Sequence, residues 1–437
     1  MKAMSNDKPQ GVCASELTSI VGEENAVCLW ENVELNQQKR IQRAIASGNL
    51  PSCIVYPRTQ EQLAVVLATA HKNNWRVLPC GSGSKLSWGG LAKGIDVVVS
   101  TERINQLIEH AVGDLTVTVE GGMKFSHLQA LLANSRQFLA LDATAPELAT
   151  IGGIVATGDT GSLRQRYGSV RDQLLGITFV RADGEIAKAG GRVVKNVAGY
   201  DLMKLFTGSY GTLGVISQVT FRLYPLQEAS ATVVLTGKAE AVSQAADTLR
   251  GSALTPIQAD LLSTKLVSGL GLGKGLGLIA RFQSISESVK EQSNRVVEVG
   301  EKLGLDGAIY VDGHEASLWE RLQERIHSPV QESVITCKIG VLPTAAVEIL
   351  SQVEFGLIHI SSGLGLLELE DKNQVLQMRL RTQAHSGFLT ILEAPVGVKE
   401  QVDVWGYTGN SLGLMRGIKE QFDSKNILSP GRFVGGI

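Results

Sequence analysis

Residues 195–214 read K-N-V-A-G-Y-D-L-M-K-L-F-T-G-S-Y-G-T-L-G, and this stretch decides the fold that the sequence predicts. Two glycine-rich segments precede it: P-C-G-S-G-S-K at 79–85 and G-G-I-V-A-T-G-D-T-G at 152–161. Backbone N–H groups freed by glycine form a concave nest for oxyanions, and two converging nests can hold a pyrophosphate. We therefore expect the three segments, as loops, to surround one large phosphate-bearing cofactor.

The first of these segments is the best candidate for a phosphate nest. Its members are Gly81, Ser82, Gly83, Ser84 and Lys85, and the two serines add hydroxyl donors to the backbone N–H groups. In the second segment, Gly152 and Gly153 let the backbone approach a cofactor more closely than side chains would allow. Turn geometry alone would explain the glycines of any single segment. Three such segments within one domain favour the cofactor.

The bulk composition indicates a folded protein of several domains that does not bind nucleic acid. At roughly 100–200 residues per domain, 437 residues predict two or three compact units. The 48 glycines far outnumber the 11 prolines, so the excess belongs to loops of a folded chain. The 41 basic and 43 acidic residues nearly cancel, and no basic block interleaved with aromatic residues occurs. The electrostatic footprint of nucleic-acid binding is therefore missing.

Cysteine usage points to a reducing compartment. The five cysteines are scattered, without a C-x-x-C pair and without histidines at zinc-ligand spacing; they are Cys13, Cys28, Cys53, Cys80 and Cys337. This pattern predicts no disulfide scaffold, iron–sulfur cluster or structural zinc. Residues 1–9 are polar, and no window approaches the ~18–20 apolar residues of a membrane helix. We expect a cytoplasmic protein with no transmembrane segment, in which any peripheral membrane attachment is made through a partner.

Residues 1–49 are an N-terminal lead-in, and residues 50–226 form one α+β unit. Within this unit, Thr59 and Gln62 form a capping box that opens a helix. A second helix is expected over 125–133, and a hairpin turns through Ala182-Asp183-Gly184. The segment at 79–85 leads to Trp88-Gly89-Gly90 and then to another strand. A Rossmann loop would pass directly into a helix, so this segment is not a Rossmann fingerprint.

A second domain is expected over residues 227–405, where strands alternate with helices. The glycines at every second position of 269–277 lack the i, i+2, i+5 spacing of a nucleotide loop, so we interpret them as a connection into a strand over 278–282. A C-terminal segment, 406–437, carries a helix over 412–422.

The motifs resemble the FAD-binding family that contains vanillyl-alcohol oxidase, D-lactate dehydrogenase and the glycolate oxidase subunits. The resemblance covers residues 50–226 and returns at the C-terminus. Four stretches are most similar to the glycolate oxidase FAD-binding subunit: G-G-I-V-A-T-G-D-T-G-S-L-R-Q-R-Y-G-S-V-R-D at 152–172, K-N-V-A-G-Y-D at 195–201, G-S-Y-G-T-L-G-V at 208–215 and S-P-G-R at 429–432. The catalytic-subunit branch has a glutamate where this chain has Tyr210. The resemblance implies an α+β fold: a two-part FAD-binding domain of the vanillyl-alcohol oxidase type with an α+β cap domain.

The resemblance also implies which residues hold FAD. Residues 81–85 would hold the pyrophosphate, and the backbone of Val215 or Ile216 would meet the adenine. The flavin side would be lined by Gly152, Gly153, Ala156 and Gly158. Some relatives attach flavin covalently through a histidine near the first loop. No histidine lies within 79–90, so we expect non-covalent FAD. Three further residues match family positions near the flavin, and their roles stay open: Lys195, Tyr200 and Asp201.

A missing motif qualifies the expected activity. Relatives that oxidise 2-hydroxy acids directly carry H-x-G-D-G-N-x-H in the second domain, where a metal can bind substrate and lower the pKa of its hydroxyl. No two of the seven histidines here have that spacing, so we interpret each as a surface or structural residue and expect no metal; they are His71, His110, His127, His314, His327, His359 and His385. The catalytic residues therefore stay unassigned.

The resemblance implies an FAD-binding subunit of a glycolate oxidase or dehydrogenase complex, in which glycolate is oxidised to glyoxylate with hydride transfer to FAD. Its partners would be a catalytic flavin subunit and an iron–sulfur subunit. A self-sufficient FAD-dependent D-2-hydroxy-acid dehydrogenase, with a carboxylate-binding arginine in the second domain, is an alternative. A non-catalytic flavin-fold subunit that only assembles the complex is another.

Overall fold

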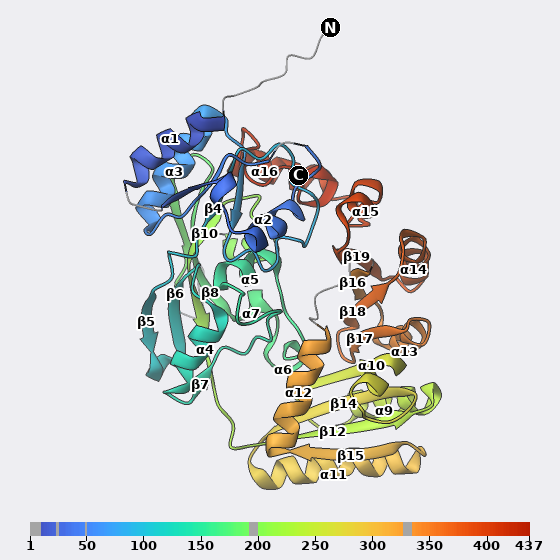
Figure 1. Cartoon of the computed structure of the whole chain (residues 1–437). Coiled ribbons are helices and arrows are strands. Elements are labelled where there is room, and N and C mark those ends of the chain that lie inside the picture. The colour runs from blue at the N-terminus through green and yellow to red at the C-terminus, as the bar shows by residue number, and fades with distance from the viewer. Residues whose placement is uncertain (1–9, 23–25, 49, 192–199, 327–333) are drawn as a thin grey trace.

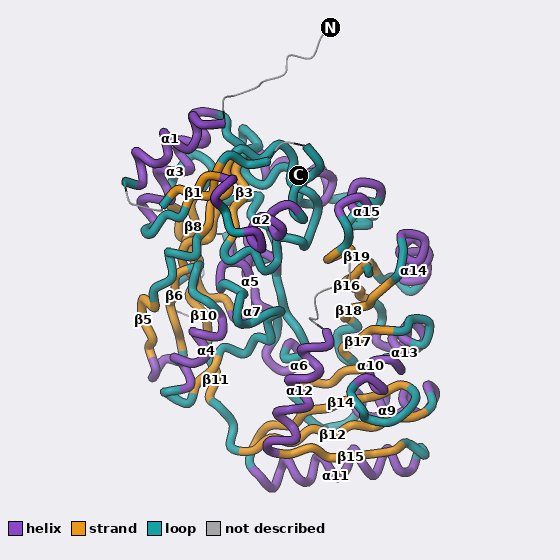
Figure 2. The backbone as a smooth tube through the Cα atoms, in the orientation of Figure 1, coloured by secondary structure: helices purple, strands orange, loops and turns teal. Residues whose placement is uncertain are grey.

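The computed structural model describes residues 10–22, 26–48, 50–191, 200–326 and 334–437. Figure 1 shows two lobes. The first lobe contains residues 10–225 and the C-terminal segment, and the second contains residues 229–404. A loop that leaves β11 (Tyr224–Pro225) crosses from the first lobe to the second (Figure 2). We keep 50–226, 227–405 and 406–437 as the proposed domain units.

The first lobe begins with a four-stranded sheet in the order β1-β2-β4-β3. Strands β2, β4 and β3 run parallel, and β1 is antiparallel to β2. The strands are β1 (Val27–Leu29), β2 (Cys53–Val55), β3 (Val77–Cys80) and β4 (Val97–Ser100). Helices α1 (Gln10–Val21) and α3 (Gln60–Asn73) bury apolar side chains against this sheet. Helix α2 (Leu35–Gln42) joins a smaller cluster around Ile54 and Val98.

The predicted start of α3 is confirmed. The Thr59 hydroxyl accepts a hydrogen bond from the Gln62 N–H, and the Gln62 side-chain oxygen accepts one from the Arg58 N–H at 2.8 Å. Between β3 and β4 the described chain forms turns and no helix, so the first glycine segment is indeed not a Rossmann loop.

A five-stranded antiparallel sheet forms the rest of the first lobe, in the order β5-β6-β10-β8-β9. The strands are β5 (Leu107–Ala111), β6 (Thr116–Glu120), β8 (Leu174–Val180), β9 (Ile186–Gly190) and β10 (Val215–Arg222). The predicted hairpin is confirmed, because β8 pairs with β9 and Ile177 lies opposite Ala189. Helices α4 (Phe125–Ala133), α5 (Ile151–Thr157) and α8 (Leu202–Phe206) share a buried core with this sheet. The bounds of α4 are those predicted.

Short elements complete the first lobe. Strand β7 (Gln137–Phe138) pairs with β11. The remaining helices are η1 (Trp30–Asn32), η2 (Val112–Asp114), α6 (Arg164–Tyr167), α7 (Val170–Gln173) and η4 (Val434–Gly436).

The sequence predicted a loop for the second glycine segment. This prediction is wrong, because the segment contains helix α5. Two adjacent glycines disfavour a helix by roughly 1 kcal/mol each, which is why the sequence indicated a loop. Capping and burial outweigh this penalty: the Thr150 hydroxyl accepts a hydrogen bond from the Gly153 N–H, and Ile154 and Val155 are fully buried. Gly158 ends the helix in the left-handed conformation, with φ at 61°.

The second lobe contains an eight-stranded antiparallel sheet in the order β15-β12-β14-β13-β17-β18-β16-β19. Two βαββαβ repeats build it, each with the strand order 4-1-3-2, and β13 and β17 join them edge to edge. The first repeat contributes β12 (Ala229–Gly237), β13 (Gln258–Leu262), β14 (Leu276–Ser284) and β15 (Asp306–Val311). The second contributes β16 (Ile335–Gly340), β17 (Phe355–His359), β18 (Leu364–Leu369) and β19 (Phe388–Glu393).

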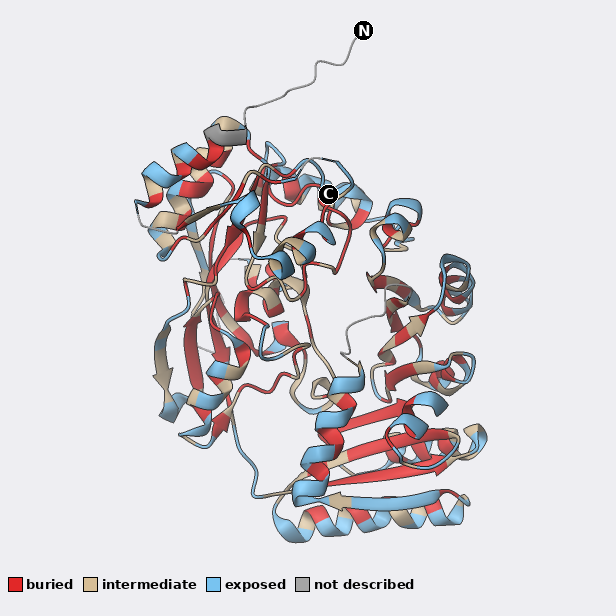
Figure 3. Cartoon of the chain, in the orientation of Figure 1, coloured by how far each residue is buried: buried red, intermediate tan, exposed pale blue. Residues whose placement is uncertain are grey.

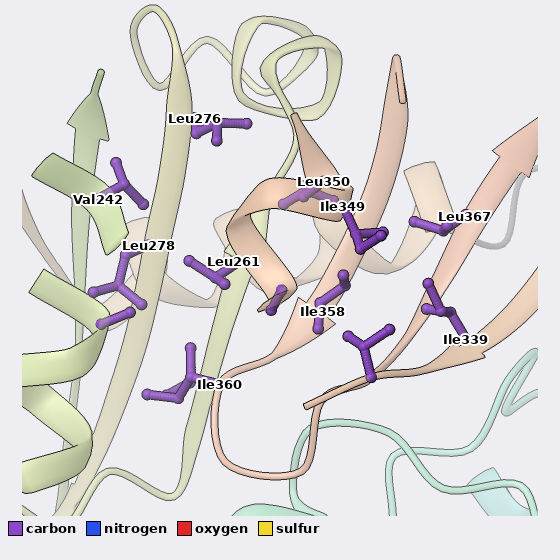
Figure 4. Close-up of a cluster of buried hydrophobic side chains, with 14 of the residues drawn as sticks. Val242, Leu261, Leu276, Leu278, Ile339, Ile349, Leu350, Ile358, Ile360 and Leu367 are labelled. Atoms are coloured by element: carbon purple, nitrogen blue, oxygen red, sulfur yellow. The ribbon is translucent and has the colours of Figure 1, made fainter. Parts of the chain in front are cut away.

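Helices cover both faces of this sheet over its first repeat. One face packs against α9 (Ala239–Gly251), α11 (Ser286–Lys302), α13 (Ala346–Leu350) and α14 (Lys372–Ala384), with η3 (Pro343–Ala345) leading into α13. Figure 4 shows this core. The other face packs against α10 (Thr264–Gly269) and α12 (Asp312–Ile326). Neighbouring residues alternate between the two cores, as Leu278 and Ile279 do, because strand side chains alternate in direction. Edge strand β15 stays largely exposed (Figure 3).

The C-terminal segment returns to the first lobe after α15 (Val396–Gln401). Helix α16 has the predicted bounds, Leu412–Phe422, and the Phe422 ring packs near Phe179 and Phe206. Leu428 pairs with Val77 in a parallel bridge at the first sheet. No helix within the described ranges is both long enough and apolar enough to cross a membrane.

Candidate functional site

The three glycine segments were expected to meet, and the structure places the described parts of all three around one cavity. This first cavity has about 670 Å³ of space, part of it open to solvent. Its lining comes from the turn after β3, from α5, from the start of β10 and from the C-terminal segment. The lining residues include Gly81, Gly83, Ser84, Lys85, Thr150, Gly152, Gly153, Ala156, Tyr210, Val215, Ile216 and Arg432.

Nine of the eleven predicted cofactor residues line this cavity, and Ser82 and Gly158 do not. The Ser82 hydroxyl instead donates a hydrogen bond to the Leu148 carbonyl oxygen. Gly158 serves as the left-handed end of α5. Lys195 lies outside the described residues. Tyr200 is 91% exposed, and the Asp201 side chain caps α8 by accepting a hydrogen bond from the Lys204 N–H.

The turn after β3 is a nest of free backbone donors. Across the described chain, no acceptor takes a hydrogen bond from the backbone N–H groups of residues 82–85. Residues 83–85 line the cavity, so their N–H groups suit an anion such as a pyrophosphate. Close packing shapes this turn, because a Cβ atom at Gly81 would lie 2.0 Å from the Thr150 hydroxyl oxygen. The donor chemistry of the cavity therefore fits a dinucleotide.

Lys85 was predicted to help hold the pyrophosphate, but its ammonium is paired within the protein. Its ammonium lies 3.2 Å from the Asp159 carboxylate and donates a hydrogen bond of 3.0 Å to the Thr144 carbonyl oxygen. Both charged side chains are buried. Asp159 also accepts hydrogen bonds from the Thr144 N–H and hydroxyl, at 2.7 and 3.0 Å. The positive charge of Lys85 is therefore already balanced by Asp159, whereas the backbone N–H groups of the turn remain available to an anion.

The S-P-G-R motif acts through Arg432. Its guanidinium donates hydrogen bonds to the carbonyl oxygens of Trp88 at 2.6 Å and Leu86 at 2.9 Å, and the Gly90 N–H donates to the Arg432 carbonyl oxygen. These bonds fix the end of the first glycine segment. Tyr210, at the same cavity, has a left-handed backbone with φ at 55°, and its ring meets Trp405 edge to face at 4.9 Å. Burial raises the pKa of Tyr210, so the phenol stays protonated at neutral pH.

A protein-family model described as an FAD binding domain matches residues 51–190, which include the nest and α5. The chain carries the FAD-binding domain of the vanillyl-alcohol oxidase and D-lactate dehydrogenase family. FAD is its cofactor.

Relatives in sequence carry names of this family. The chain is 28% identical over 304 residues to a mitochondrial cytochrome D-lactate dehydrogenase of Arabidopsis thaliana, a match that covers 66% of this chain and 53% of the relative. It is 26% identical to a probable mitochondrial D-lactate dehydrogenase of Danio rerio, covering 87% and 84%. It is 30% identical to the glycolate oxidase subunit GlcD of Bacillus subtilis, covering 43% and 40%. The chain thus spans about half the length of the Arabidopsis thaliana relative and less than half of the Bacillus subtilis relative.

Solved structures share the fold of the FAD-binding family. p-Cresol methylhydroxylase with substrate bound matches with a TM-score of 0.73 at 17% identity, covering 96% of both chains. Alkyldihydroxyacetonephosphate synthase matches with a TM-score of 0.69 at 16% identity, covering 99% of this chain and 87% of that one. At these identities the likeness establishes the α+β fold of the vanillyl-alcohol oxidase type and nothing further.

A second cavity, with about 730 Å³ of space, lies between the two lobes of this FAD-binding protein. The first lobe contributes Trp88, Asp142, Thr144 and 159–162 to its lining. The second lobe contributes Asp260, Trp319, Lys338, His359, Leu366 and several apolar neighbours. Lys85 connects the two cavities, because it lines the first cavity while its ammonium contacts Asp159 and Thr144 of the second.

A buried carboxylate and a histidine meet in the second cavity. His359 Nδ1 lies 2.6 Å from Asp260 Oδ1, which also accepts a hydrogen bond of 2.7 Å from the Ser162 hydroxyl of the other lobe. Asp260 is fully buried, and no residue that the structure describes forms a hydrogen bond with its Oδ2 atom. Burial lowers the pKa of His359, but the charge and hydrogen bond of Asp260, together with the charge of Asp142, outweigh it and leave the pKa raised.

His359 was interpreted from the sequence as a surface or structural residue, and no local spacing indicates its partner, which lies 99 residues earlier in the chain. Residues 359–366 read H-I-S-S-G-L-G-L, which retains the first histidine and the central glycine of H-x-G-D-G-N-x-H. Leu366 stands where the motif has its second histidine. Within the described ranges, no group of three or more histidine, cysteine or acidic residues is placed to hold a metal ion.

Proposed function

We propose that this protein is an FAD-dependent oxidoreductase that oxidises the CH–OH group of a 2-hydroxy acid in the cavity between the lobes. The observation that carries the proposal is the arrangement of two linked cavities. One is a backbone anion nest within the FAD-binding domain, and the other is an inter-lobe cavity whose lining includes Lys338 and His359; Lys85 joins them. The names of the relatives support the substrate class, because they are dehydrogenases or oxidases of D-lactate, glycolate and D-2-hydroxyglutarate. FAD, when bound, would supply a hydride acceptor.

The chain's own residues would bind and orient this cofactor. The N–H groups of 83–85 would hold the pyrophosphate, and Gly152 and Gly153 at the start of α5 let the backbone come close. Val215 and Ile216 would meet the adenine end. The ring of Tyr210, which packs against Trp405, forms part of one wall of the cavity.

We propose that FAD binds without a covalent link. The described lining of the first cavity contains no histidine, and its thiol belongs to Cys80. Burial raises the pKa of the Cys80 thiol to about 12, so the thiolate needed for attack on a flavin is scarce at neutral pH.

We further propose that glycolate is the substrate and that the chain works within a glycolate oxidase complex, beside a catalytic flavin subunit and an iron–sulfur subunit. The support is the set of motifs similar to the glycolate oxidase FAD-binding subunit, and the partial match to a glycolate oxidase subunit. All five cysteines are free, which agrees with a cytoplasmic complex whose clusters reside in another chain. Any contact with a membrane would be made through these partners.

The second candidate is a self-sufficient D-2-hydroxy-acid dehydrogenase. The inter-lobe cavity favours it, because both lobes of this one chain line it and contribute charged side chains to it. A subunit that only assembles the complex, the third alternative, would not require such a site.

The test is a visible spectrum of the purified chain, recorded anaerobically with glycolate, D-lactate or D-2-hydroxyglutarate. Flavin bands that bleach with one acid would support oxidation by this chain alone and name its substrate. Bands that bleach only after the partner subunits are added would support the complex. A chain that cannot be reconstituted with FAD would contradict the cofactor site built from 81–85 and α5.

A further inference from the structure

We propose that the second cavity binds the carboxylate of its substrate at Lys338 and passes the substrate's hydroxyl proton to His359, which Asp260 positions. This inference rests on the proposed function, because it assigns groups to the same substrate cavity. It assigns to a lysine the role that the self-sufficient alternative gave to an arginine, because no arginine is among the described residues that line this cavity.

Lys338 is a cation without a partner. It lies in β16 and lines the cavity, and across the described chain its ammonium makes no hydrogen bond and no ion pair. The negative charge of Asp159 acts on Lys338, but Asp159 is already paired with Lys85. Burial lowers the pKa of Lys338, with Arg164 acting in the same direction. A partly buried ammonium costs free energy until an anion binds it, so this position suits a small carboxylate.

His359 presents one nitrogen to the cavity. Its Nδ1 must donate to the Asp260 carboxylate, which can only accept, so the neutral ring has its other nitrogen, Nε2, as an acceptor. No described group hydrogen-bonds to Nε2. Asp260 is itself fixed by the Ser162 hydroxyl from the first lobe. This is the arrangement of a general base whose orientation a buried carboxylate sets.

The assigned groups balance the reaction. The substrate O–H bond breaks and its proton moves to His359 Nε2. The C2–H bond also breaks, and its hydrogen leaves with both electrons as a hydride, for which bound FAD would be the acceptor. The C2–O bond becomes a carbonyl, so the hydroxy acid is oxidised to a 2-oxo acid. The Asp260 carboxylate then faces an imidazolium and stabilises it.

The test uses the FAD-loaded full chain and oxalate, a dicarboxylate that cannot be oxidised at a CH–OH group. Calorimetric titration measures binding, and anaerobic flavin bleaching by the best hydroxy acid measures oxidation. Lys338→Met should weaken oxalate binding by about 10- to 100-fold, the usual effect of losing a charged hydrogen bond. The matched control is Lys265→Met on the surface of the same lobe, where Lys265 pairs with Glu354; it should leave binding unchanged.

His359→Gln should slow flavin reduction by at least about 100-fold while the variant still binds oxalate. His385→Gln, at a partly exposed histidine 3.8 Å from Glu348, is its control and should reduce flavin at the wild-type rate. A thermal melt separates site from scaffold: Lys338→Met should melt at the wild-type temperature or above, because it removes a buried charge that has no partner.

Each result decides one part. If Lys338→Met binds oxalate with wild-type affinity, whatever its melting temperature, the carboxylate site is overturned. Wild-type reduction in His359→Gln overturns the proton acceptor but leaves the proposed function standing. Oxalate binding that is lost in Lys338→Met, in a chain that never reduces its flavin alone or with partners, supports the carboxylate site and overturns the proposed oxidation together with the role of His359.

Discussion

Gly81→Ala should weaken FAD binding by about tenfold or more. A Cβ atom at residue 81 would lie 2.0 Å from the Thr150 hydroxyl oxygen and 2.7 Å from its methyl carbon. Because nonbonded carbon atoms pack at about 3.5–4.0 Å, the turn after β3 or the start of α5 must move by ~1 Å or more. Overpacking of this kind costs about 1–3 kcal/mol, and 1.4 kcal/mol is tenfold in a dissociation constant. Fluorescence titration of the apoprotein with FAD measures the change.

The matched control is Gly113→Ala, where an added Cβ meets nothing within 4 Å. This variant should bind FAD and melt as the wild type does. Thr150→Gly removes the side chain that would clash, although it also removes the cap of α5, which for a change to glycine costs roughly a few tenths of a kcal/mol. In a double-mutant cycle, Gly81→Ala should therefore cost at least about 1 kcal/mol less in the Thr150→Gly background. A Gly81→Ala variant with wild-type affinity and melting temperature would refute the close-packing argument.

Three further predictions concern buried groups. The ammonium of Lys399 donates hydrogen bonds to the carbonyl oxygens of Ser87, Gly89 and Leu392, and burial lowers its pKa to about 7. In the unfolded chain the pKa of Lys399 is 10.5, so between about pH 7 and 10.5 the unfolded state binds more protons than the folded state and the free energy of unfolding rises with pH. The melting temperature of the wild type minus that of Lys399→Met should therefore increase across this pH range. A difference that does not change with pH would be inconsistent with the lowered pKa. Burial raises the thiol pKa of Cys53 and Cys337 to about 12, and both side chains are fully buried, so iodoacetamide at pH 8 should alkylate them only after unfolding. Mass spectrometry of native and urea-treated protein checks this, and equal labelling in both would contradict their burial. Phe206→Ala should destabilise the first lobe by about 3–5 kcal/mol, because this fully buried ring lies 4.0 Å from the ring of Phe179, centroid to centroid. The control is Leu414→Ala, at a side chain that is 69% exposed. Similar melting temperatures for the two variants would exclude a core role for Phe206.

Local signals in the sequence were sufficient for elements whose ends depend on neighbouring residues. The N-cap at Thr59, the hairpin after β8 and the bounds of α4 and α16 were all predicted, since a cap, a turn or an apolar period lies within a few residues; the Gln62 side chain, however, bonds the Arg58 N–H and not the Thr59 N–H of a capping box. The failure at α5 has the opposite cause. Its two glycines favour a loop locally, whereas burial of Ile154 and Val155 against a sheet distant in sequence favours the helix.

The sequence by itself determined the FAD-binding character of this protein, because glycine spacing and motif order are written along the chain in 79–85, 152–161 and 208–215. Only the tertiary structure decided how charges are paired. It set Lys85 against Asp159, joined His359 to an aspartate 99 residues away, and placed Lys338 in the inter-lobe cavity with no partner among the residues described. Pairings of this kind depend on strand order and on how two lobes meet. No periodicity or local spacing encodes them, so they follow from the packed chain alone.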